Sequence, residues 1–234
     1  MPTRRVCVVI GVGPGNGAAF ARRFAADGHA VALLARSAAT SRELAGSLPD
    51  ARAYECDVGD AASVQRTFDA IRADLGDPAV VIYNAGSGTF GTFDDVEASH
   101  LEASFRVNTL GAFLVAKQVV PAMKRAGRGS FIFVGATASR RGTARTVAFA
   151  PAKAAQRSLA ESLAKHLWPA GIHVSLIVID GVVDLERTRK MMPDAPEEFF
   201  VKANDVAATA AWLAAQPRSA WAFEVEARPF GERW

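Results

Sequence analysis

Short apolar runs alternate with segments of helical periodicity along almost the whole of this chain. Seven of the runs are predicted to be strands: Val6–Ile10, Val31–Ala35, Arg52–Cys56, Ala79–Tyr83, Phe131–Val134, Ile172–Ile179 and Trp221–Ala227. Between them, apolar residues recur at the spacing of one helix face over 18–26, 61–75, 96–124, 150–168 and 204–215. Strands that are apolar on both faces and joined by helices form parallel sheets covered on both sides. The expected fold is therefore α/β, a doubly wound parallel sheet of seven strands of the Rossmann type.

The chain is expected to form a single dinucleotide-binding domain over residues 1–234. This length is enough for one large α/β domain with a well-filled core. The sequence contains no internal repeat, low-complexity segment or linker between domains. One stretch, Asp184–Lys202, is polar and poorly periodic, so we expect a mobile loop there, with Asn204 capping the helix that follows.

Charge and cysteine content restrict the partners and the compartment. The net charge is +3, and Lys and Arg are spread along the chain, which favours a solvated surface over a nucleic-acid interface. Cys7 and Cys56 lie in strand-like runs without metal-ligand spacing, as core thiols in a reducing compartment do. The apolar run after Arg5 is too short for a signal peptide, and no run is long enough to span a membrane. We expect a cytoplasmic protein with a small-molecule substrate, no metal, and no membrane or nucleic-acid partner.

A glycine-rich turn follows the first predicted strand and leads into a helix: Gly11-Val12-Gly13-Pro14-Gly15-Asn16-Gly17. Glycines are needed where a tight turn brings bare backbone to a pyrophosphate, and the helix N-terminus adds amide donors and partial positive charge. The glycine pattern of dinucleotide-binding proteins can be aligned with this turn in two ways. One alignment starts at Gly13; the other uses Gly11, Gly15 and Gly17 and fits better, because its first glycine follows the strand directly. A tight connection alone would also explain such a turn. With the motifs described below, it predicts dinucleotide binding through Gly11, Gly15, Asn16 and Gly17.

The end of the second predicted strand indicates which dinucleotide is bound. An NAD-preferring enzyme has an acidic residue there, which accepts hydrogen bonds from the ribose hydroxyls. Here the position is Ala35, and the next residue, Arg36, has a guanidinium that can pair with a 2′-phosphate. An ordinary surface arginine would explain Arg36 but not the missing carboxylate. NADP(H) is therefore the expected cofactor.

Three further motifs follow in order: Asp57-Val58 after the third strand, Asn84-Ala85-Gly86 after the fourth, and Asn108 in the long helix. Together with the glycine turn, their order and intervals resemble the short-chain dehydrogenase/reductase family. The resemblance implies that the first motif contacts adenine, and that the second steadies the sheet and lets the cofactor lie close. It also implies that Asn108 holds a water molecule of the proton relay.

Two positions depart from the family pattern where its proton chemistry resides. The segment Phe149-Ala150-Pro151-Ala152-Lys153 resembles the family's Tyr-x-x-x-Lys motif with the phenol lost, and Ala136 stands where the family has its catalytic serine. In the family, the lysine lowers the pKa of the phenol and binds the nicotinamide ribose. Lys153 and Asn108 are therefore the expected catalytic residues that remain. Losing a positioned acid costs about 10²–10⁴ in rate and losing an oxyanion donor about 10²–10³, so carbonyl reduction by the usual route should be very slow.

Several residues are candidates to replace the missing acid. The candidates outside the motif are Tyr83, Ser87, His100, Thr137 and Ser139, of which Tyr83 is expected to pack beneath a helix and His100 to be exposed. Lys153 is either retained for ribose binding or free to act as the acid itself. After the sixth strand, Asp180 and Asp184 add carboxylates, and the resemblance leaves Val183 to present its backbone to the nicotinamide carboxamide.

Two functions of different classes remain open. The first is an NADP(H)-binding oxidoreductase with a degenerate active site, acting on a small carbonyl or alcohol or on a substrate that needs no strong acid. The second is a sensor or scaffold that binds the cofactor without turnover. The glycine turn, Arg36, Asn108 and Lys153 fit both. Family members are usually homodimers or homotetramers, and the resemblance implies the same here.

Overall fold

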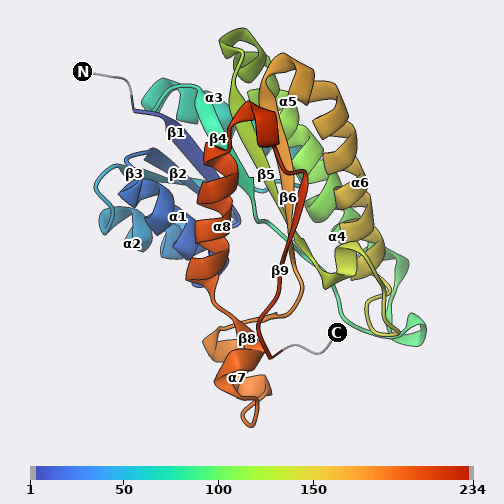
Figure 1. Cartoon of the computed structure of the whole chain (residues 1–234). Helices are drawn as coiled ribbons and strands as arrows, with labels where there is room; N and C mark the ends of the chain where they lie inside the picture. Colours follow the sequence, from blue (N-terminus) through green and yellow to red (C-terminus); the bar gives the residue numbers. More distant parts are fainter. Residues whose placement is uncertain (1–3, 232–234) are drawn as a thin grey trace.

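Seven parallel strands form the main sheet of the protein (Figure 1). The computed structural model describes residues 4–231, and its main strands are β1 (Val6–Ile10), β2 (Ala30–Ala35), β3 (Ala51–Glu55), β4 (Pro78–Tyr83), β5 (Gly129–Ala136), β6 (Ile172–Ile179) and β9 (Glu224–Ala227). Their order is β3-β2-β1-β4-β5-β6-β9, and every neighbouring pair is parallel. The predicted fold class is confirmed.

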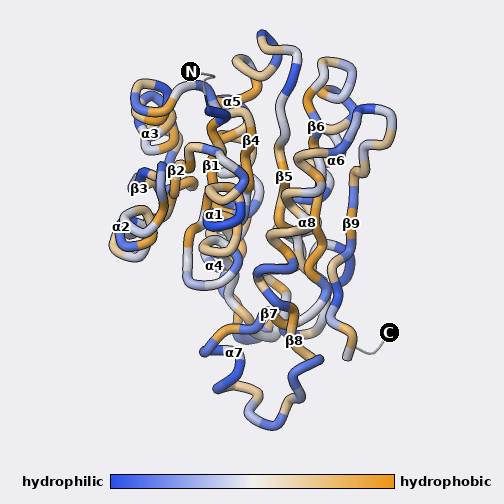
Figure 2. Tube along the Cα trace, turned by 60° about the vertical axis from the view of Figure 1, so that its left-hand side comes forward, coloured by the Kyte–Doolittle hydropathy of each residue, from blue (hydrophilic) through white to orange (hydrophobic). Residues whose placement is uncertain are grey.

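Helices cover both faces of this sheet because its central strands are apolar on both faces. On one face lie α1 (Asn16–Ala26), α2 (Ala38–Gly46) and α8 (Ala203–Ala215), and on the other lie α3 (Ala61–Asp74), α5 (Gly111–Ala126) and α6 (Phe149–Leu167). Successive residues of a strand belong to opposite cores: Val8 of β1 belongs to the core of α3, α5 and α6, whereas Val9 belongs to that of α1 and α8. Figure 2 shows the central strands, β1, β4, β5 and β6, as largely hydrophobic traces between these layers.

The segment predicted as one helix over 96–124 is divided in the structure. It follows a short 3-10 turn and consists of α4 (Ala98–Phe105), a π-helical turn η2 (Arg106–Leu110) and α5. In the π turn, the N–H of Gly111 donates to the carbonyl oxygen of Arg106, five residues back instead of four. The spacing of apolar residues did not reveal one inserted residue in so long a helical segment.

Three local predictions differ from the structure. The segment Asp184–Lys202 is not an irregular loop: it contains α7 (Glu186–Met191), and two short strands, β7 (Val182–Val183) and β8 (Phe200–Val201), pair in parallel beside it. The predicted cap at Asn204 is wrong, because α8 begins at Ala203 with Lys202 as its N-cap residue. Helix α2 was not predicted, since its short polar sequence buries one large apolar residue, Leu44.

The two cysteines lie in the hydrophobic core. Cys7 and Cys56 are free and buried, and burial raises the pKa of both thiols, as expected for core cysteines. No helix within residues 4–231 combines the length and the apolarity that a membrane span requires. The His, Cys, Asp and Glu side chains of the same range form no group that is arranged to hold a metal ion.

Candidate active site

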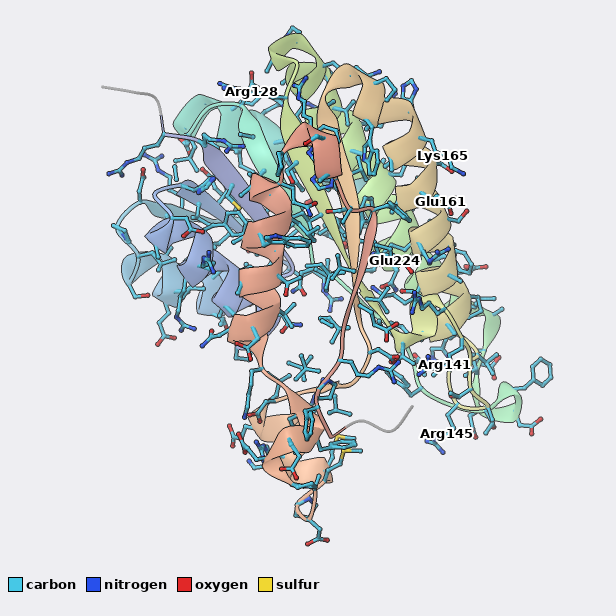
Figure 3. All side chains as sticks on the ribbon, viewed as in Figure 1. Arg128, Arg141, Arg145, Glu161, Lys165 and Glu224 are labelled. Atoms are coloured by element: carbon cyan, nitrogen blue, oxygen red, sulfur yellow. The ribbon has the colours of Figure 1, made fainter. Side chains whose placement is uncertain are left out.

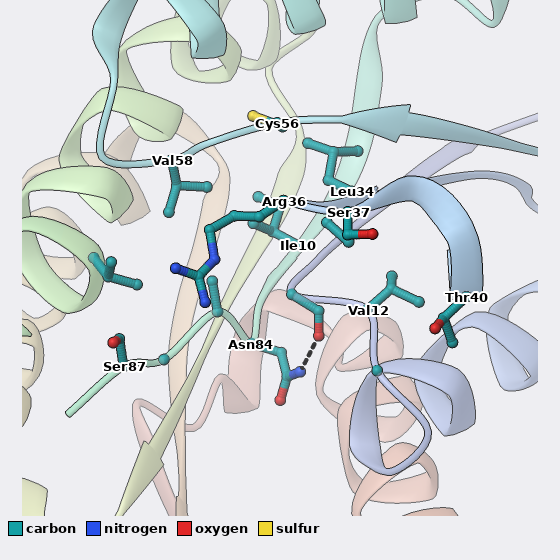
Figure 4. Close-up of a pocket in the computed structure, with 16 residues that line it drawn as sticks. Ile10, Val12, Leu34, Arg36, Ser37, Thr40, Cys56, Val58, Asn84 and Ser87 are labelled. Atoms are coloured by element: carbon teal, nitrogen blue, oxygen red, sulfur yellow. Dashed lines mark hydrogen bonds between the residues drawn. The ribbon is translucent and has the colours of Figure 1, made fainter. Parts of the chain in front are cut away.

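The glycine turn and the segment after β4 are locked together at the carboxyl edge of the sheet. Gly11 has φ of +85°, and a Cβ atom at this position would lie 2.5 Å from the backbone nitrogen of Ala85. Asn84 Nδ2 donates a hydrogen bond of 2.8 Å to the carbonyl oxygen of Gly11 (Figure 4). A Cβ atom at Gly17 would lie 2.6 Å from the same oxygen, so α1 starts in contact with the strand end. Only glycine fits these two positions, for reasons of backbone geometry and close approach.

A cavity of about 400 Å³ opens beside this contact (Figure 4). It lies where the strand order reverses between β1 and β4, which is where open α/β sheets bind their ligands. Six residues predicted to bind the cofactor line it: Gly11, Arg36, Val58, Asn84, Ala85 and Gly86. The structure therefore brings together motifs that are widely separated in the sequence.

Arg36 extends from the end of β2 into this cavity, toward Val58 and Ser87 (Figure 4). Its side chain is exposed, and no carboxylate within residues 4–231 forms an ion pair with it. Ser37 and Thr40, at the start of α2, place two hydroxyls on the same rim. The guanidinium, the hydroxyls and the helix N-terminus together form a site suited to an anion.

Sequence reasoning missed several lining residues. Ser37 is the N-cap residue of α2 and Thr40 lies in its first turn, and this helix was not predicted; their signal was the Ser/Thr pattern at the start of a helix. Val12, Cys56 and Val107 also line the cavity. Each of these three adjoins or lies close to a recognised motif, but their apolar side chains give no chemical signal of their own.

Other predicted residues lie outside the cavity. Asp57 lines a neighbouring cavity of about 410 Å³ that also includes Arg36, and Asp57 Oδ1 accepts a hydrogen bond from the N–H of Gly59. Gly15 and Asn16 lie at the start of α1, where Asn16 Oδ1 is buried without a hydrogen-bond partner among the described residues. Val183 lies in β7, and its carbonyl oxygen accepts a hydrogen bond from Thr188.

The side chain of Lys153 is buried between α6 and the end of β5. Its Nζ donates hydrogen bonds of 2.7 Å to the carbonyl oxygen of Val134 and to Gln156 Oε1. The Val134 carbonyl is available because the β4–β5 pairing ends at Tyr83 and Phe133. Burial lowers the pKa of Lys153 to about 7. A surface role for this lysine is excluded by its burial.

Gln156 connects Lys153 to Asn108. Its Nε2 donates a hydrogen bond of 2.9 Å to the backbone oxygen of Asn108, which lies in the π turn. Asn108 Nδ2 in turn donates to the carbonyl oxygens of Ser87 and Ser104, and its Oδ1 has no partner among the described residues. The fully buried Gln156 was not singled out from the sequence, because its long polar side chain resembles any other helix residue there.

Phe149 begins α6 and is held against the segment after β4. A Cβ atom at Gly88 would lie 2.9 Å from the Cβ of Phe149, so the aromatic side chain rests on bare backbone. The rings of Phe149 and Phe90 have centroids 5.2 Å apart at an angle of 44°. Gly91 N donates to the carbonyl oxygen of Arg145, which joins this segment to the one preceding α6, on the side where Figure 3 shows Arg141 and Arg145. Ala136, at the end of β5, adds a methyl group to the same edge.

Of the candidate replacement acids, Ser87 lines the cofactor cavity, and Tyr83, Ser139 and His100 form hydrogen bonds within the protein. Tyr83 is buried beneath the helical segment, as predicted, and its hydroxyl donates to the carbonyl oxygen of Val107. Ser139 Oγ accepts a hydrogen bond of 3.1 Å from the backbone N–H of Ala136. His100 is only half-buried, and its Nδ1 accepts from the backbone N–H of Glu97 in the first turn of α4.

The two carboxylates after β6 are ion-paired. Burial alone would raise the pKa of Asp180, but the hydrogen bond from Thr137 and the charges of Arg141 and Arg228 outweigh it and lower that pKa. Hydrogen bonds from Arg189 and Lys202 lower the pKa of Asp184 well below its usual range. Both groups remain carboxylates near neutral pH, so neither carries a proton to donate.

The sequence and the structure of this chain are similar to those of known proteins. A family model described as short chain dehydrogenase matches residues 5–195. The 3-oxoacyl-acyl-carrier-protein reductase MabA of Mycobacterium tuberculosis is 32% identical over 187 residues, covering 80% of this chain and 72% of that relative. A solved metagenomic short-chain oxidoreductase in complex with NADP is 27% identical, with a TM-score of 0.82 over 97% of this chain and 98% of the other. An alcohol dehydrogenase from the archaeon Thermococcus sibiricus complexed with 5-hydroxy-NADP is 25% identical, with a TM-score of 0.88 and 98% of each chain covered.

Proposed function

This chain belongs to the short chain dehydrogenase family, and we propose that it is an NADP(H)-binding oxidoreductase with an altered proton path. One observation carries the proposal: the cavity at the strand-order reversal is lined by the glycine turn, the Asn84 motif and Arg36, whose guanidinium forms no ion pair within residues 4–231. A reduced nicotinamide would supply the hydride, and the residues described above would hold and orient the cofactor.

The residues present fit a dinucleotide. The contacts at Gly11 and Gly17 leave bare backbone at the turn, where a pyrophosphate needs to approach closely. The first turn of α1 adds amide donors and the partial positive charge of a helix N-terminus. Asp57 and Val58 are proposed to contact adenine, and Lys153 and Val183 to act at the nicotinamide end.

The anion site at the end of β2 favours NADP(H) over NAD(H). Ala35 offers no carboxylate to the ribose hydroxyls, and Arg36 has no acidic partner within residues 4–231 that would compete with a phosphate. Ser37 and Thr40 add hydroxyl donors on the same rim. The two solved relatives in complex with NADP or a derivative support the same preference.

The proton chemistry is proposed to be degenerate at two positions. Phe149 and Ala136 stand where the family has its tyrosine and serine, and neither side chain can donate a proton. Lys153 and Asn108 remain, and Gln156 links them. The substrate is therefore one that does not depend on a strong acid from the protein.

A sensor or scaffold that binds NADP(H) without turnover is the second candidate. It is favoured by one observation, the engagement of Lys153, Tyr83 and Thr137 with acceptors inside the protein. Calorimetric titration with NADPH and NADH, beside NADPH oxidation across ketones, aldehydes and quinones, distinguishes the two. Binding with turnover supports the oxidoreductase, binding without turnover supports the sensor, and no binding of either cofactor contradicts both.

A homodimer or homotetramer is proposed as the assembly. Apolar side chains on α4, the π turn and α5 are exposed: Leu101, Leu110 and Phe113 have 36%, 44% and 44% of their surface accessible. Leu110 and Phe113 line one shallow cavity with Leu159 of α6. Light scattering on the purified protein tests the proposal, and a monomer at micromolar concentration would contradict it.

A further inference from the structure

The edge of the site beside the cofactor cavity is an aromatic wall, formed by Phe90 and Phe149. Gly88, on which Phe149 rests, follows Ser87 of the cavity lining by one residue, so the wall continues directly from the cavity. Phe90 has 61% of its surface exposed, and Phe149 is partly exposed, which leaves aromatic surface open to a ligand. Aromatic faces attract cations through their quadrupole.

The side chains of Lys153, Thr137 and Tyr83 are directed to acceptors of the protein itself, whereas Ser87, an alcohol of ordinarily high pKa, lines the cavity. Lys153 donates to Val134 and Gln156, at 2.7 Å each. Thr137 Oγ1 donates to Asp180 at 2.6 Å, and Tyr83 donates to the carbonyl oxygen of Val107. A substrate oxygen that becomes negative during the reaction therefore receives no proton from Lys153, Thr137 or Tyr83 as they are oriented here.

The number of charges created by hydride transfer determines which hydride acceptor such a site favours. Hydride transfer from a neutral reduced nicotinamide to a neutral carbonyl creates two opposite charges, an alkoxide and a pyridinium. Creating ions is costly where the surroundings are apolar and no donor stabilises the anion. When the acceptor is already a cation, the positive charge only moves from acceptor to nicotinamide, so the number of charges stays the same.

We propose that the substrate class of this site is a preformed iminium cation, a deepening that rests on the proposed NADP(H)-dependent function. The iminium carbon accepts the hydride and a C–H bond forms. The π pair of the C=N bond becomes the lone pair of the nitrogen, and the products are a tertiary amine and NADP⁺. No proton is taken from the protein or from water. The aromatic wall binds the cation, and the absence of an acid does not slow this reaction because no proton is transferred.

The kinetic test compares N-methyl-3,4-dihydroisoquinolinium with 1-tetralone, a neutral ketone of similar size and shape. With NADPH, and after subtraction of the uncatalysed rate, kcat/KM for the iminium should exceed that for the ketone by roughly 100-fold or more, the effect of one missing oxyanion donor or acid. The Phe149→Tyr, Ala136→Ser double variant should raise turnover of the ketone about 10-fold or more and change that of the iminium far less, because only the ketone needs a proton.

A binding test does not depend on turnover. In the presence of NADPH, whose nicotinamide is neutral, N,N-dimethyl-1,2,3,4-tetrahydroisoquinolinium, which cannot accept hydride, should bind more tightly than 1-tetralone by calorimetry. Phe149→Leu keeps an apolar side chain but removes the ring, and it should weaken binding of the cation roughly 2- to 30-fold while changing binding of the ketone less.

Three results would overturn the proposal. Turnover of the ketone equal to or faster than that of the iminium would show that a proton donor acts in the site. If the wild-type protein and Phe149→Leu bind the cation with equal affinity, the aromatic wall does not take part in recognising it. Iminium reduction no faster than in buffer, while NADPH binds, would overturn the substrate class alone; failure of NADPH to bind would instead overturn the function on which it rests.

Discussion

Nζ of Lys153 donates a 2.7 Å hydrogen bond to Oε1 of Gln156, and both side chains are buried. Gln156 Nε2 is bonded to the backbone oxygen of Asn108, so the orientation of its amide is fixed and its oxygen stays on Lys153. Burial lowers the pKa of Lys153 to about 7. A buried amine in this position makes the stability of the protein depend on pH.

The first prediction concerns that dependence. The folded-state pKa of Lys153 is about 7, below the usual value near 10.5 in the unfolded chain, so between these values the unfolded state binds more protons. The free energy of unfolding should therefore rise with pH across this window. From pH 7 to pH 9 the wild type should gain about 2 kcal/mol relative to Lys153→Met, measured by urea denaturation. A constant difference between the two proteins would contradict the lowered pKa.

Gln156 should control both the stability and this pH profile. Gln156→Met keeps the volume but leaves Lys153 with one acceptor fewer and the Asn108 carbonyl without its donor, so we expect a loss of about 2–4 kcal/mol. Gln156→Glu places a carboxylate beside the ammonium, which raises the pKa of Lys153 and flattens the gain between pH 7 and 9. The same denaturation series measures both variants. If Glu and Met give the same profile, Gln156 only fills space.

Arg36 should determine the preference for NADPH over NADH. Removing a charge-assisted contact to the 2′-phosphate in Arg36→Ala should weaken NADPH binding roughly 10- to 100-fold and leave NADH binding nearly unchanged. Arg42→Ala, an exposed arginine in α2 that does not line the cavity, is the matched control. Calorimetric titration with both cofactors gives the answer. Equal losses in the two variants would assign the effect to general surface charge.

Gly11 and Gly28 form a matched pair for testing the glycine turn, since both have φ of +85°. A Cβ at Gly28 meets nothing within 4 Å, whereas one at Gly11 would lie 2.5 Å from the Ala85 nitrogen. Gly28→Ala should cost about 1–2 kcal/mol from backbone strain alone, and Gly11→Ala clearly more than that. Gly11→Ala should also weaken NADPH binding. Similar denaturation midpoints for the two variants would contradict the close contact.

A helix, strand or turn could be predicted from the sequence where its own residues carry a recognisable pattern. Strands such as Val6–Ile10 can be predicted from apolar runs, and helices such as α3 from the periodicity of apolar residues. The glycine turn can be predicted from its residue types and from its position after the first strand. The π turn, α2 and α7 could not be predicted, because one inserted residue, a short polar helix, or a helix beside ion pairs leaves no local pattern. Six of the predicted cofactor residues line one cavity because parallel strands bring their carboxyl ends to one edge.

The sequence by itself determined the doubly wound sheet, the position of the glycine turn, and the presence of Phe149 and Ala136 where proton donors were expected. Only the tertiary structure decided what surrounds them: the seat of Phe149 on Gly88, the link of Lys153 through Gln156 to Asn108, and the pairing of Asp180 with Thr137. These contacts join residues from different strands and helices. Their partners depend on strand order and helix placement, which no single segment of the sequence encodes.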